Sequence, residues 1–529
     1  MQDFFNVLYQ HIISVILLTT LASGIVTALF PSKTPEHKLK SVCLIFSGII
    51  FVLSLILYFQ FNCNYAGLQF CEKMPWIPSL NINYSVGVDG ISLFLVLLTT
   101  FMIPLVTLSI NTKTAALKYY FALYFFLEFT MLGTFFANDL VLFYVFWELM
   151  LIPMYMLIGI WGGPNRIYAT VKFFIYTFFG SIFMLFGLIW VITYFYNANG
   201  FFSFEISELA AFPFSLVTQN FLFWLFAVAF MIKVPVFPFH TWLPHAHVEA
   251  PTGGSVILAA VLLKMGTYGL LRFCLPMFPD ASNKFAILMT FLGAFAVLYG
   301  ALMSYAQTDL KKLIAYSSVS HMGVIIAGIF ALNHYGISGA IVQMINHGLS
   351  TGALFLLAGV IYERRHTREI AEFGGLAKVM PLYSTIFMIV TFSSIGLPGL
   401  NGFIGEFLIL LGAFKFSWPL ALLTSTGVIF GAVYMLYAYE KIFLGQITNE
   451  KNSALNDLTF IEKASLAPIL IFIFVIGVYP SFITAATDAA VKNISSSVLR
   501  EYDIKNTKSS GFNNPQNFKP SNSINDKKL

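Results

Sequence analysis

The stretch FMIKVPVFPFHTWLPHAHVEAPTGGSVILAAVLLK, residues 230–264, decides how this chain folds. Lys233 lies near the end of one apolar run, Lys264 lies in the middle of the next, and two prolines interrupt the segment after Lys233. A lysine at the centre of a membrane helix costs about 2.5–3.5 kcal/mol on insertion scales. Two such residues therefore indicate a function that depends on buried charge.

The composition around this stretch is that of a polytopic membrane protein. Of the 529 residues, 58% are hydrophobic and only 10% are charged, whereas soluble domains are about 25% charged. The net charge of +5 is spread over loops, so no basic block indicates nucleic acid. The sequence contains no Walker A motif and no dinucleotide fingerprint. We therefore expect one membrane domain that carries out no redox or hydrolytic chemistry by itself.

The N-terminus and the cysteines carry two further expectations. The first residues lack the basic segment and small-residue cleavage site of a secretory signal, so the first span is predicted to be retained. The four cysteines include no C-x-x-C pair, which argues against an iron–sulfur or structural zinc site. Cys63 and Cys71 share one loop and would be able to pair in an oxidising compartment, but we favour free thiols.

Apolar runs of about 20 residues predict membrane-spanning helices, because that length crosses the hydrocarbon core. The chain has fourteen such runs: 11–30, 40–60, 87–110, 119–137, 140–160, 170–194, 219–240, 255–275, 285–305, 313–332, 336–361, 382–410, 418–440 and 464–486.

The basic residues predict the orientation of these spans, since lysine and arginine accumulate in cytoplasmic loops. Loops after odd-numbered spans carry sixteen of the 29 basic residues, loops on the other side carry four, and the segment after the last span carries seven. Both termini are therefore predicted to face the periplasm. The remaining two are Lys233 and Lys264, and we expect all others to stay near water.

Spans four to eight (residues 119–275) and nine to thirteen (284–445) share one plan. The fourth member of each set is interrupted, by KVPVFPFH in the first and by SSIGLPGLNGFIG in the second. The second interruption lies in a run of 29 residues, about 43 Å as one helix, which exceeds a hydrocarbon core of about 30 Å. It therefore predicts two half-helices. Five spans per set reverse the direction of the second copy, which is the inverted-repeat plan of many transporters.

Three further segments flank these repeats: a three-span segment at 1–118, a C-terminal helix at 446–486 and a tail at 487–529. The tail is rich in serine, asparagine and lysine and poor in large apolar residues, so we expect it to be disordered.

Six ionisable side chains are predicted to form a row inside the spans: Glu148, Lys233, Lys264, His321, His347 and Glu406. At about 3 kcal/mol each, the four charged members cost about as much as the net stability of a whole domain. One alternative is that oppositely charged neighbours merely hold helices together, but apolar packing would do so at lower cost. The two histidines have a second alternative, as ordinary core residues.

Proton transfer is the use that such a row suits best. A lysine in a dry site can release its proton near neutral pH, and a nearby carboxylate restores its proton affinity. A change in the distance from Glu148 to Lys233 would therefore load and unload the lysine. Histidine, with a reference pKa near 6.5, suits the links between such groups.

Other ionisable residues carry less information. Glu128, midway along the fourth span, suits a relay or a structural hydrogen bond equally well, and Asp139 and Glu440 are expected to be solvated near the interface. Four residues cluster just after the first interruption, but their spacing matches no zinc pattern and they are expected to be hydrated, so we expect no metal site. They are His240, His245, His247 and Glu249.

With these residues in hand, the chain resembles the antiporter-like subunits of respiratory complex I. The matching motifs are FWELMLIPMYMLIGIWGG at 146–163, KVPVFPFHTWLPHAHVEAPTGGSVILAAVLLKMGTYG at 233–269, AYSSVSHMG at 315–323, NHGLSTGALFLLAG at 346–359 and GLPGLNGFIGEF at 396–407. These motifs cover spans five to twelve. The chain departs from the family at His245, where the motif usually has aspartate, so a proton-entry role does not carry over to that side chain.

The resemblance implies a role for each member of the row. Glu148 and Lys233 correspond to the family's glutamate–lysine pair, Lys264 to its central lysine, and His321 and His347 to links of its polar axis. Glu406 corresponds to the last proton-carrying residue of the family's polar axis, a position at which sister subunits carry lysine. Protons would move from cytoplasm to periplasm, driven by electron transfer in other subunits.

The resemblance also implies the surroundings of the chain. No cofactor is expected in this chain, while FMN, iron–sulfur clusters and quinone belong to partner subunits. The expected partners are the other membrane subunits of the complex, especially neighbouring antiporter-like ones, in a bacterial cytoplasmic membrane. Two alternative functions remain, a subunit of a multisubunit cation/proton antiporter and a structural spacer subunit.

Overall fold

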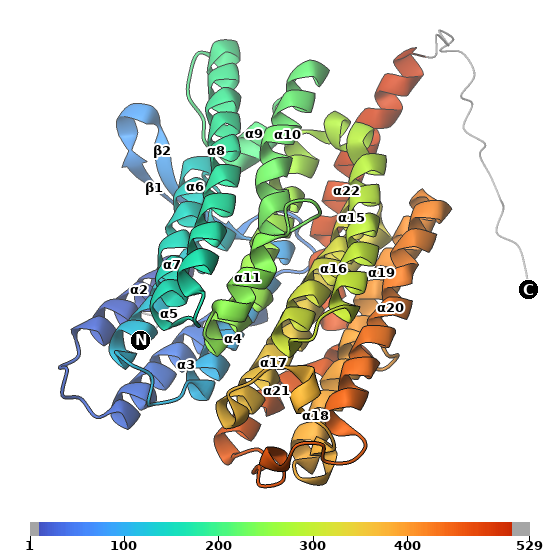
Figure 1. Ribbon diagram of the computed structural model, residues 1–529. Helices are drawn as coiled ribbons and strands as arrows, with labels where there is room; N and C mark the ends of the chain where they lie inside the picture. The colour runs from blue at the N-terminus through green and yellow to red at the C-terminus, as the bar shows by residue number, and fades with distance from the viewer. Residues whose placement is uncertain (1–9, 510–529) are drawn as a thin grey trace, which may run out of the picture.

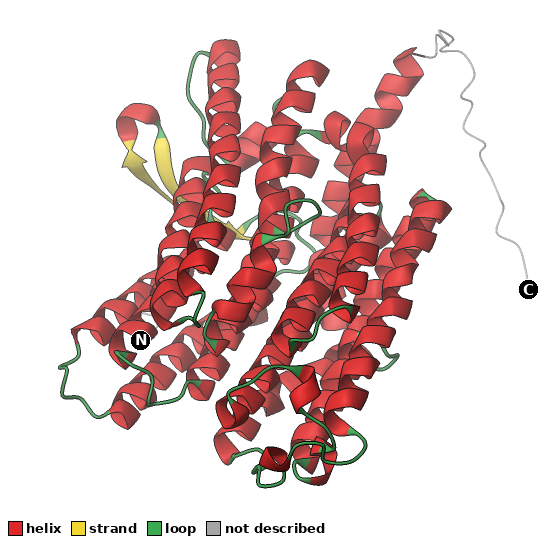
Figure 2. Cartoon of the chain, in the orientation of Figure 1, coloured by secondary structure: helices red, strands yellow, loops and turns green. Residues whose placement is uncertain are grey.

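The computed structural model describes residues 10–509 and is a bundle of long helices (Figure 1). Most of this part of the chain is helical, and a single β-hairpin projects at one end (Figure 2). Within the described residues, thirteen helical segments are long and apolar enough to cross a membrane. The two shorter helices α18 (Pro381–Ser394) and α19 (Asn401–Phe416) occupy the place of the predicted run 382–410. The prediction of an all-α polytopic protein with about fourteen spans is therefore confirmed.

Three helices and the hairpin form the N-terminal part: α2 (Ile12–Leu29), α3 (Glu36–Gln60), β1 (Gln69–Ile77), η1 (Pro78–Leu80), β2 (Ile82–Val88) and α4 (Gly90–Ser109). The two strands are antiparallel, and Asn81 adopts the left-handed conformation (φ 57°) between them. Helix α4 begins after Asp89, whose carboxylate accepts the backbone N–H groups of Ile91 and Ser92. The capped helix therefore begins at Gly90, directly after the hairpin, whereas this span was predicted to begin at residue 87.

The next group of helices contains the first interruption: α5 (Leu117–Phe136), α6 (Leu140–Leu149), α7 (Leu151–Trp161), α8 (Arg166–Asn199), α9 (Ile206–Ala211), α10 (Leu216–Lys233) and α11 (Trp242–Glu249). The predicted span 219–240 is thus discontinuous, since α10 ends at Lys233 and a new helix starts only at Trp242.

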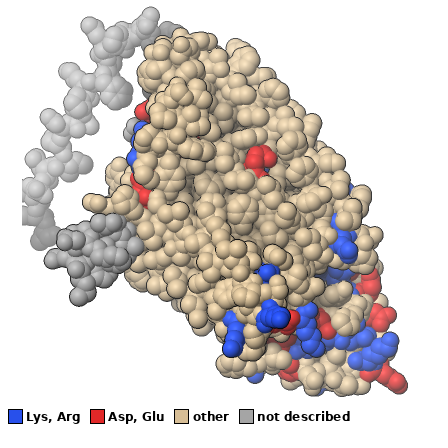
Figure 3. Space-filling view, turned by 90° about the vertical axis from the view of Figure 1, so that its left-hand side faces the viewer, with Lys and Arg blue, Asp and Glu red and all other residues tan. Residues whose placement is uncertain are grey.

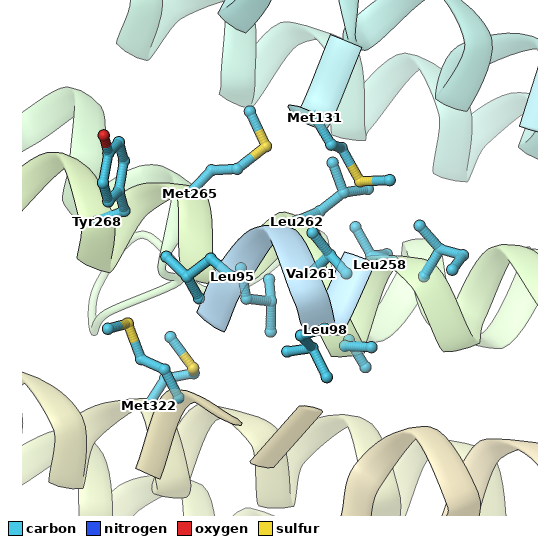
Figure 4. Packing of buried hydrophobic residues seen from close by; sticks show 14 of the residues in the cluster. Leu95, Leu98, Met131, Leu258, Val261, Leu262, Met265, Tyr268 and Met322 are labelled. Atoms are coloured by element: carbon cyan, nitrogen blue, oxygen red, sulfur yellow. The ribbon is translucent and has the colours of Figure 1, made fainter. Parts of the chain in front are cut away.

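The following span, Thr252–Met277, is helical throughout but contains two π-helical segments: α12 (Thr252–Ile257), η2 (Leu258–Leu262), α13 (Leu263–Gly269), η3 (Leu270–Cys274) and α14 (Leu275–Met277). We call it the central helix, because its most apolar 18-residue window is completely buried. Figure 4 shows Leu258 and Leu262 packed against Met131 of α5, with Leu98 of α4 on another side. The central helix is therefore enclosed by protein rather than by lipid.

The second group contains the other interruption: α15 (Pro279–Tyr305), α16 (Leu310–Phe330), α17 (His334–Arg365), η4 (Ile370–Glu372), η5 (Leu376–Lys378), α18, α19 and α20 (Trp418–Phe443). Because Gly300 lacks a side chain, α15 and α16 pack closely: an added Cβ would lie 2.6 Å from the backbone nitrogen of Ser320. The predicted pair of half-helices is confirmed by α18 and α19.

The chain ends with η6 (Glu450–Asn452), α21 (Phe460–Val478) and α22 (Ser481–Ser509). The last predicted span, 464–486, was extended too far, because Pro480 separates α21 from α22. Disorder from residue 487 onward was also wrong for the part that the structure describes, since α22 is helical to Ser509 and buries Ile483 and Val491. The remaining residues of that tail, 510–529, lie outside the described part.

Lysine and arginine side chains gather at one end of the face shown in Figure 3, which we call the basic end. Two lysines near this end are nevertheless buried, contrary to expectation. Lys40 is 9% exposed and donates to the carbonyl of Ile110 at 2.7 Å. Lys311 is 7% exposed and donates to the carbonyl of Ala250 at 2.6 Å. Carbonyl groups thus replace the water that we expected around them.

Asp139 was expected to be solvated and is instead completely buried. Its carboxylate caps α6 by accepting the N–H groups of Val141 and Leu142, and it also accepts the N–H of Asn83 at 3.2 Å. Burial raises the pKa of Asp139 to about 6, although these three hydrogen bonds act in the opposite direction. Glu440 is exposed, as expected.

Candidate functional site

Lys264 lies at the centre of the site, on α13 directly after the first π-helical segment. Its side chain is completely buried. The ammonium group donates to the carbonyl of Ala259, which belongs to the π segment, and lies 2.6 Å from Nδ1 of His347. π-helical turns are rare and occur frequently at functional sites. Here the π segment supplies a backbone acceptor to a cation that forms no ion pair of 4.0 Å or less with a carboxylate among the described residues.

Two histidines continue from Lys264. His347 of α17 and His321 of α16 are both buried, and their ring centroids are 5.7 Å apart. Nε2 of His347 has no hydrogen-bond partner within the described residues. His347 is therefore not a core histidine with both nitrogens satisfied.

Glu406 of α19 lies at the other end of this row. Its Oε1 is 3.3 Å from Nδ1 of His321 and accepts a hydrogen bond from Nε2 of Gln343 at 3.2 Å. The other ring nitrogen of His321 lies 3.3 Å from the hydroxyl of Ser394. A small pocket between α16, α19 and α20 is lined by both His321 and Glu406. Lys264, His347, His321 and Glu406 thus form a row in which each member lies close to the next, and we call it the polar row. No hydrogen bond joins the two histidines among the described residues.

Polar side chains hold the break beside Glu406 in place. Asn346 of α17 donates to the carbonyl of Asn401 at 2.6 Å, and Ser350 lies 2.5 Å from Ser393. Gly396 has a positive φ of 74°, and an added Cβ would lie 2.7 Å from Oε2 of Glu406. The break therefore needs glycine both for its backbone conformation and for the space that Glu406 occupies.

Lys233 and Glu148 form a second group. Lys233 is the last residue of α10, where the partial negative charge of a helix end favours a cation. Its Nζ lies 3.5 Å from Sδ of Met150 and 4.9 Å from the ring centroid of Trp147. Glu148 is half-buried, and one of its oxygens has no hydrogen-bond partner among the described residues. The two charges interact electrostatically.

Within the described residues, no ion pair of 4.0 Å or less joins Glu148 to Lys233. No hydrogen bond there links this pair to Lys264 either. The structure therefore brings four of the six predicted residues into one row and leaves Glu148 and Lys233 as a separate pair.

The residues after the first interruption do not converge on one point. His240 lies 3.2 Å from the hydroxyl of Tyr299, His247 stacks on Phe355, and Glu249 accepts the N–H of Asn165. In the part of the chain that the structure describes, no three His, Cys, Asp or Glu residues are placed to hold a metal ion. Cys63 and Cys71 are free thiols, as we favoured.

Sequence reasoning missed several neighbours of the row. Gln343, Ser394 and the carbonyl of Ala259 each contact one of its members. The signal for Gln343 was present, because an amide in the middle of an otherwise apolar span needs a partner. No pattern in the sequence marks the carbonyl of Ala259.

Comparisons with known proteins identify the family. Residues 137–431 match the family model described as "NADH:quinone oxidoreductase/Mrp antiporter, TM". NADH-quinone oxidoreductase subunit M of Rickettsia bellii is 43% identical over 490 residues, which is 91% of this chain and 98% of that protein. NADH-ubiquinone oxidoreductase chain 4 of Arabidopsis thaliana is 42% identical over 496 residues, or 93% of this chain and 99% of that protein.

Solved structures agree with this result. A chain of respiratory complex I from Thermus thermophilus with bound NADH matches with a TM-score of 0.84 and 32% identity, over 92% of this chain and 99% of that one. A chain of the Mrp complex from Dietzia sp. shares the fold, with a TM-score of 0.81 at 18% identity over 93% of this chain and 99% of that one. The chain therefore belongs to the NADH:quinone oxidoreductase/Mrp antiporter transmembrane family.

Proposed function

We propose that this chain is the subunit M type of proton-translocating membrane subunit in NADH:quinone oxidoreductase. The observation that carries the proposal is the buried row of neighbouring ionisable groups from Lys264 through His347 and His321 to Glu406. Four ionisable groups in one apolar interior are costly to bury, and a function that moves charge explains why they are there.

Each member of the site has a distinct role in this proposal. Glu148 sets the proton affinity of Lys233 through its charge, so a change in their separation loads or unloads the lysine. Lys264 takes up the proton next and passes it to His347, from which it reaches Glu406 by way of His321. The proton leaves through the pocket beside Glu406. Transfer runs from the cytoplasm, at the basic end, to the periplasm.

The driving force comes from outside this chain. The chain acts as a subunit of an oxidoreductase, and electron transfer takes place in partner subunits that hold FMN, iron–sulfur clusters and quinone. The chain itself holds no cofactor. It lies in the bacterial cytoplasmic membrane with both termini in the periplasm, beside the other membrane subunits of the complex. Residues 119–275 and 284–445 are its two inverted repeats.

Two other functions follow from the same fold. A multisubunit cation/proton antiporter is favoured by the shared fold with the Mrp complex chain, and it would make proton movement depend on sodium rather than on NADH. A structural spacer would leave the polar row without a role in transport, so substitutions there would leave pumping unchanged.

Replacement of Lys264 by alanine in membranes that contain the whole complex tests the proposal. NADH-driven acidification of inverted vesicles should fall sharply while the complex remains assembled on native gels. Exposed Lys451→Ala is the matched control and should pump normally. Normal pumping by the Lys264 variant would contradict the proposal, and NADH-independent, sodium-driven proton movement would favour the antiporter.

A further inference from the structure

Glu128 of α5 is a buried carboxyl group that the polar row does not use. It is 0% exposed, and neither of its oxygens has a hydrogen-bond partner within the described residues. Glu128 therefore does not form the structural hydrogen bond that was one of its two expected roles. A buried carboxyl without a partner is costly, and an ionisable group inside a membrane span points to a functional site.

Two tyrosines lie on the same face of α5 as Glu128. Tyr124 and Tyr120 precede it by four and eight residues, which places all three side chains in one line along the helix. Both tyrosines are buried, at 1% and 3% exposure, and their hydroxyl oxygens are 3.3 Å apart. Hydroxyl groups both donate and accept hydrogen bonds, so the two tyrosines are chemically able to pass a proton from one to the other.

The outer end of the line reaches a cavity at the basic end. The cavity has a volume of about 270 Å³, and its polar lining includes Lys40, Thr252 and Glu363. Glu363 is exposed and acts electrostatically on Tyr120. Next to Thr252, Gly253 leaves room for the hydroxyl of Tyr124, which would lie 2.5 Å from an added Cβ. The hydroxyl of Tyr124 therefore lies one residue along the chain from the cavity lining, and the hydroxyl of Tyr120 lies beside it.

The inner end of the line reaches the level of Lys264. Helix α5 runs along the central helix: Tyr124 lies at Gly253, Met131 packs on Leu258 and Leu262 (Figure 4), and Tyr268 donates to the carbonyl of Phe135. Glu128 lies between the first two of these contacts, level with the start of the π segment. The Lys264 side chain points back to the same segment, at Ala259.

We propose that Glu128 is a proton-carrying residue that connects the cavity at the basic end with Lys264. Each tyrosine hydroxyl gives its proton to the next group and takes one from the group before it, starting from the cavity. The Glu128 carboxyl group gives its proton to the neutral amine of Lys264, which leaves a carboxylate and an ammonium ion. The carboxylate is then reprotonated through Tyr124. This inference rests on the proposed function and adds an uptake route to it.

The test uses the whole complex in inverted vesicles, with Glu128→Gln, Glu128→Asp and Tyr124→Phe. Glu128→Gln keeps the shape but cannot release a proton, so the pumping rate per NADH oxidised should fall about tenfold or more. Glu128→Asp should recover most of this loss. Glu440→Gln and Tyr155→Phe, on exposed residues of the chain, are the matched controls.

Infrared difference spectra give a readout that a structural role would not change. Turnover should shift a carbonyl-stretch band of a protonated carboxyl group, and this band should disappear in Glu128→Gln. If the Glu128→Gln complex does not assemble, the pumping rate of Tyr124→Phe and the infrared spectrum of the wild type are the test. Normal pumping by Tyr124→Phe, together with a wild-type spectrum that has no turnover-dependent carboxyl band, overturns the inference.

Lys264→Ala in the same vesicles separates the two proposals. Loss of pumping in Lys264→Ala with normal pumping in Glu128→Gln overturns the uptake route and leaves the proposed function intact. Normal pumping in both variants overturns the proposed function itself. Loss in both, with recovery by Glu128→Asp, supports the route.

Discussion

The ion pair between Arg272 and Asp89 fastens the end of the central helix far from the basic end to the start of α4, and its removal has a calculable cost. Nη1 and Oδ2 are 2.9 Å apart, and the side chains are 19% and 5% exposed. Two unit charges at this distance attract by about 6 kcal/mol at an effective dielectric constant of about 20. After the offset from desolvation, removal of one partner of a buried pair costs about 3–5 kcal/mol.

Two substitutions of Asp89 separate its charge from its cap. Asp89→Asn keeps the cap on α4, since asparagine is as good an N-cap as aspartate, whereas Asp89→Ala loses about 1 kcal/mol more. An unfolding entropy of about 2.1 cal/mol/K per residue gives about 1 °C per kcal/mol for a chain of this length. We therefore expect the midpoint of heat inactivation to fall by about 3–5 °C, and by a further ~1 °C for alanine. Native gels of heated membranes measure the intact complex.

A double variant provides the refutation. Asp89→Asn combined with Arg272→Met removes both charges, so the complex should regain part of the lost stability, because no lone buried charge remains. A wild-type midpoint for Asp89→Asn, or a double variant less stable than Asp89→Asn, would show that the pair does not hold the helix as described.

Three further predictions concern other parts of the fold. Gly402→Ala should prevent assembly of the complex on native gels, because its Cβ would lie 2.0 Å from a carbonyl oxygen of α18, whereas Gly431→Ala, with nothing closer than 3.9 Å, should assemble normally. Arg364→Lys should lower the heat-inactivation midpoint, because lysine cannot donate to both carboxylate oxygens of Glu462 as the arginine does at 2.7 and 2.8 Å. Burial raises the pKa of Asp139 from 3.8 to about 6, so the folded state holds this proton more tightly and stability should fall by about 3 kcal/mol between pH 4 and 7. Asp139→Asn should remove that slope in midpoints measured across pH, and an unchanged slope would contradict the assignment.

The spans and their breaks were predictable because length and hydropathy determine them locally. A run of about 20 apolar residues has few alternatives in a bilayer, and the 29-residue run 382–410 was too long for one crossing. The members of the polar row were likewise recognisable as charges in apolar surroundings. Which of them touch was not predictable, because the contact between Lys264 and His347 depends on packing between helices 83 positions apart.

The failures have physical causes of the same kind. Helix α22 buries Ile483, Val491 and Val498 at intervals of seven or eight residues, and this thin apolar stripe is hidden in an overall polar composition. Asp139 has the composition of a solvated loop residue, but the orphan N–H groups at the start of α6 bind it inside the protein. The β-hairpin lacks the Asn-Gly or Asp-Gly turn that would have marked it.

The geometry of the site also depends on how many residues the π segment before Lys264 contains, and not only on the chemistry of those residues. A π turn holds one residue more than an α turn, so every side chain beyond residue 262 is turned by about 100° relative to an uninterrupted α-helix. Insertion of a single apolar residue within 258–262 would remove no charge and no polar side chain. It would nevertheless turn Lys264 by about 100° away from His347, so an in-frame insertion of one apolar residue is expected to be as damaging as the loss of the lysine. Deletion of one residue there would leave an α-turn in place of the π turn and keep Lys264 on the same face of the helix.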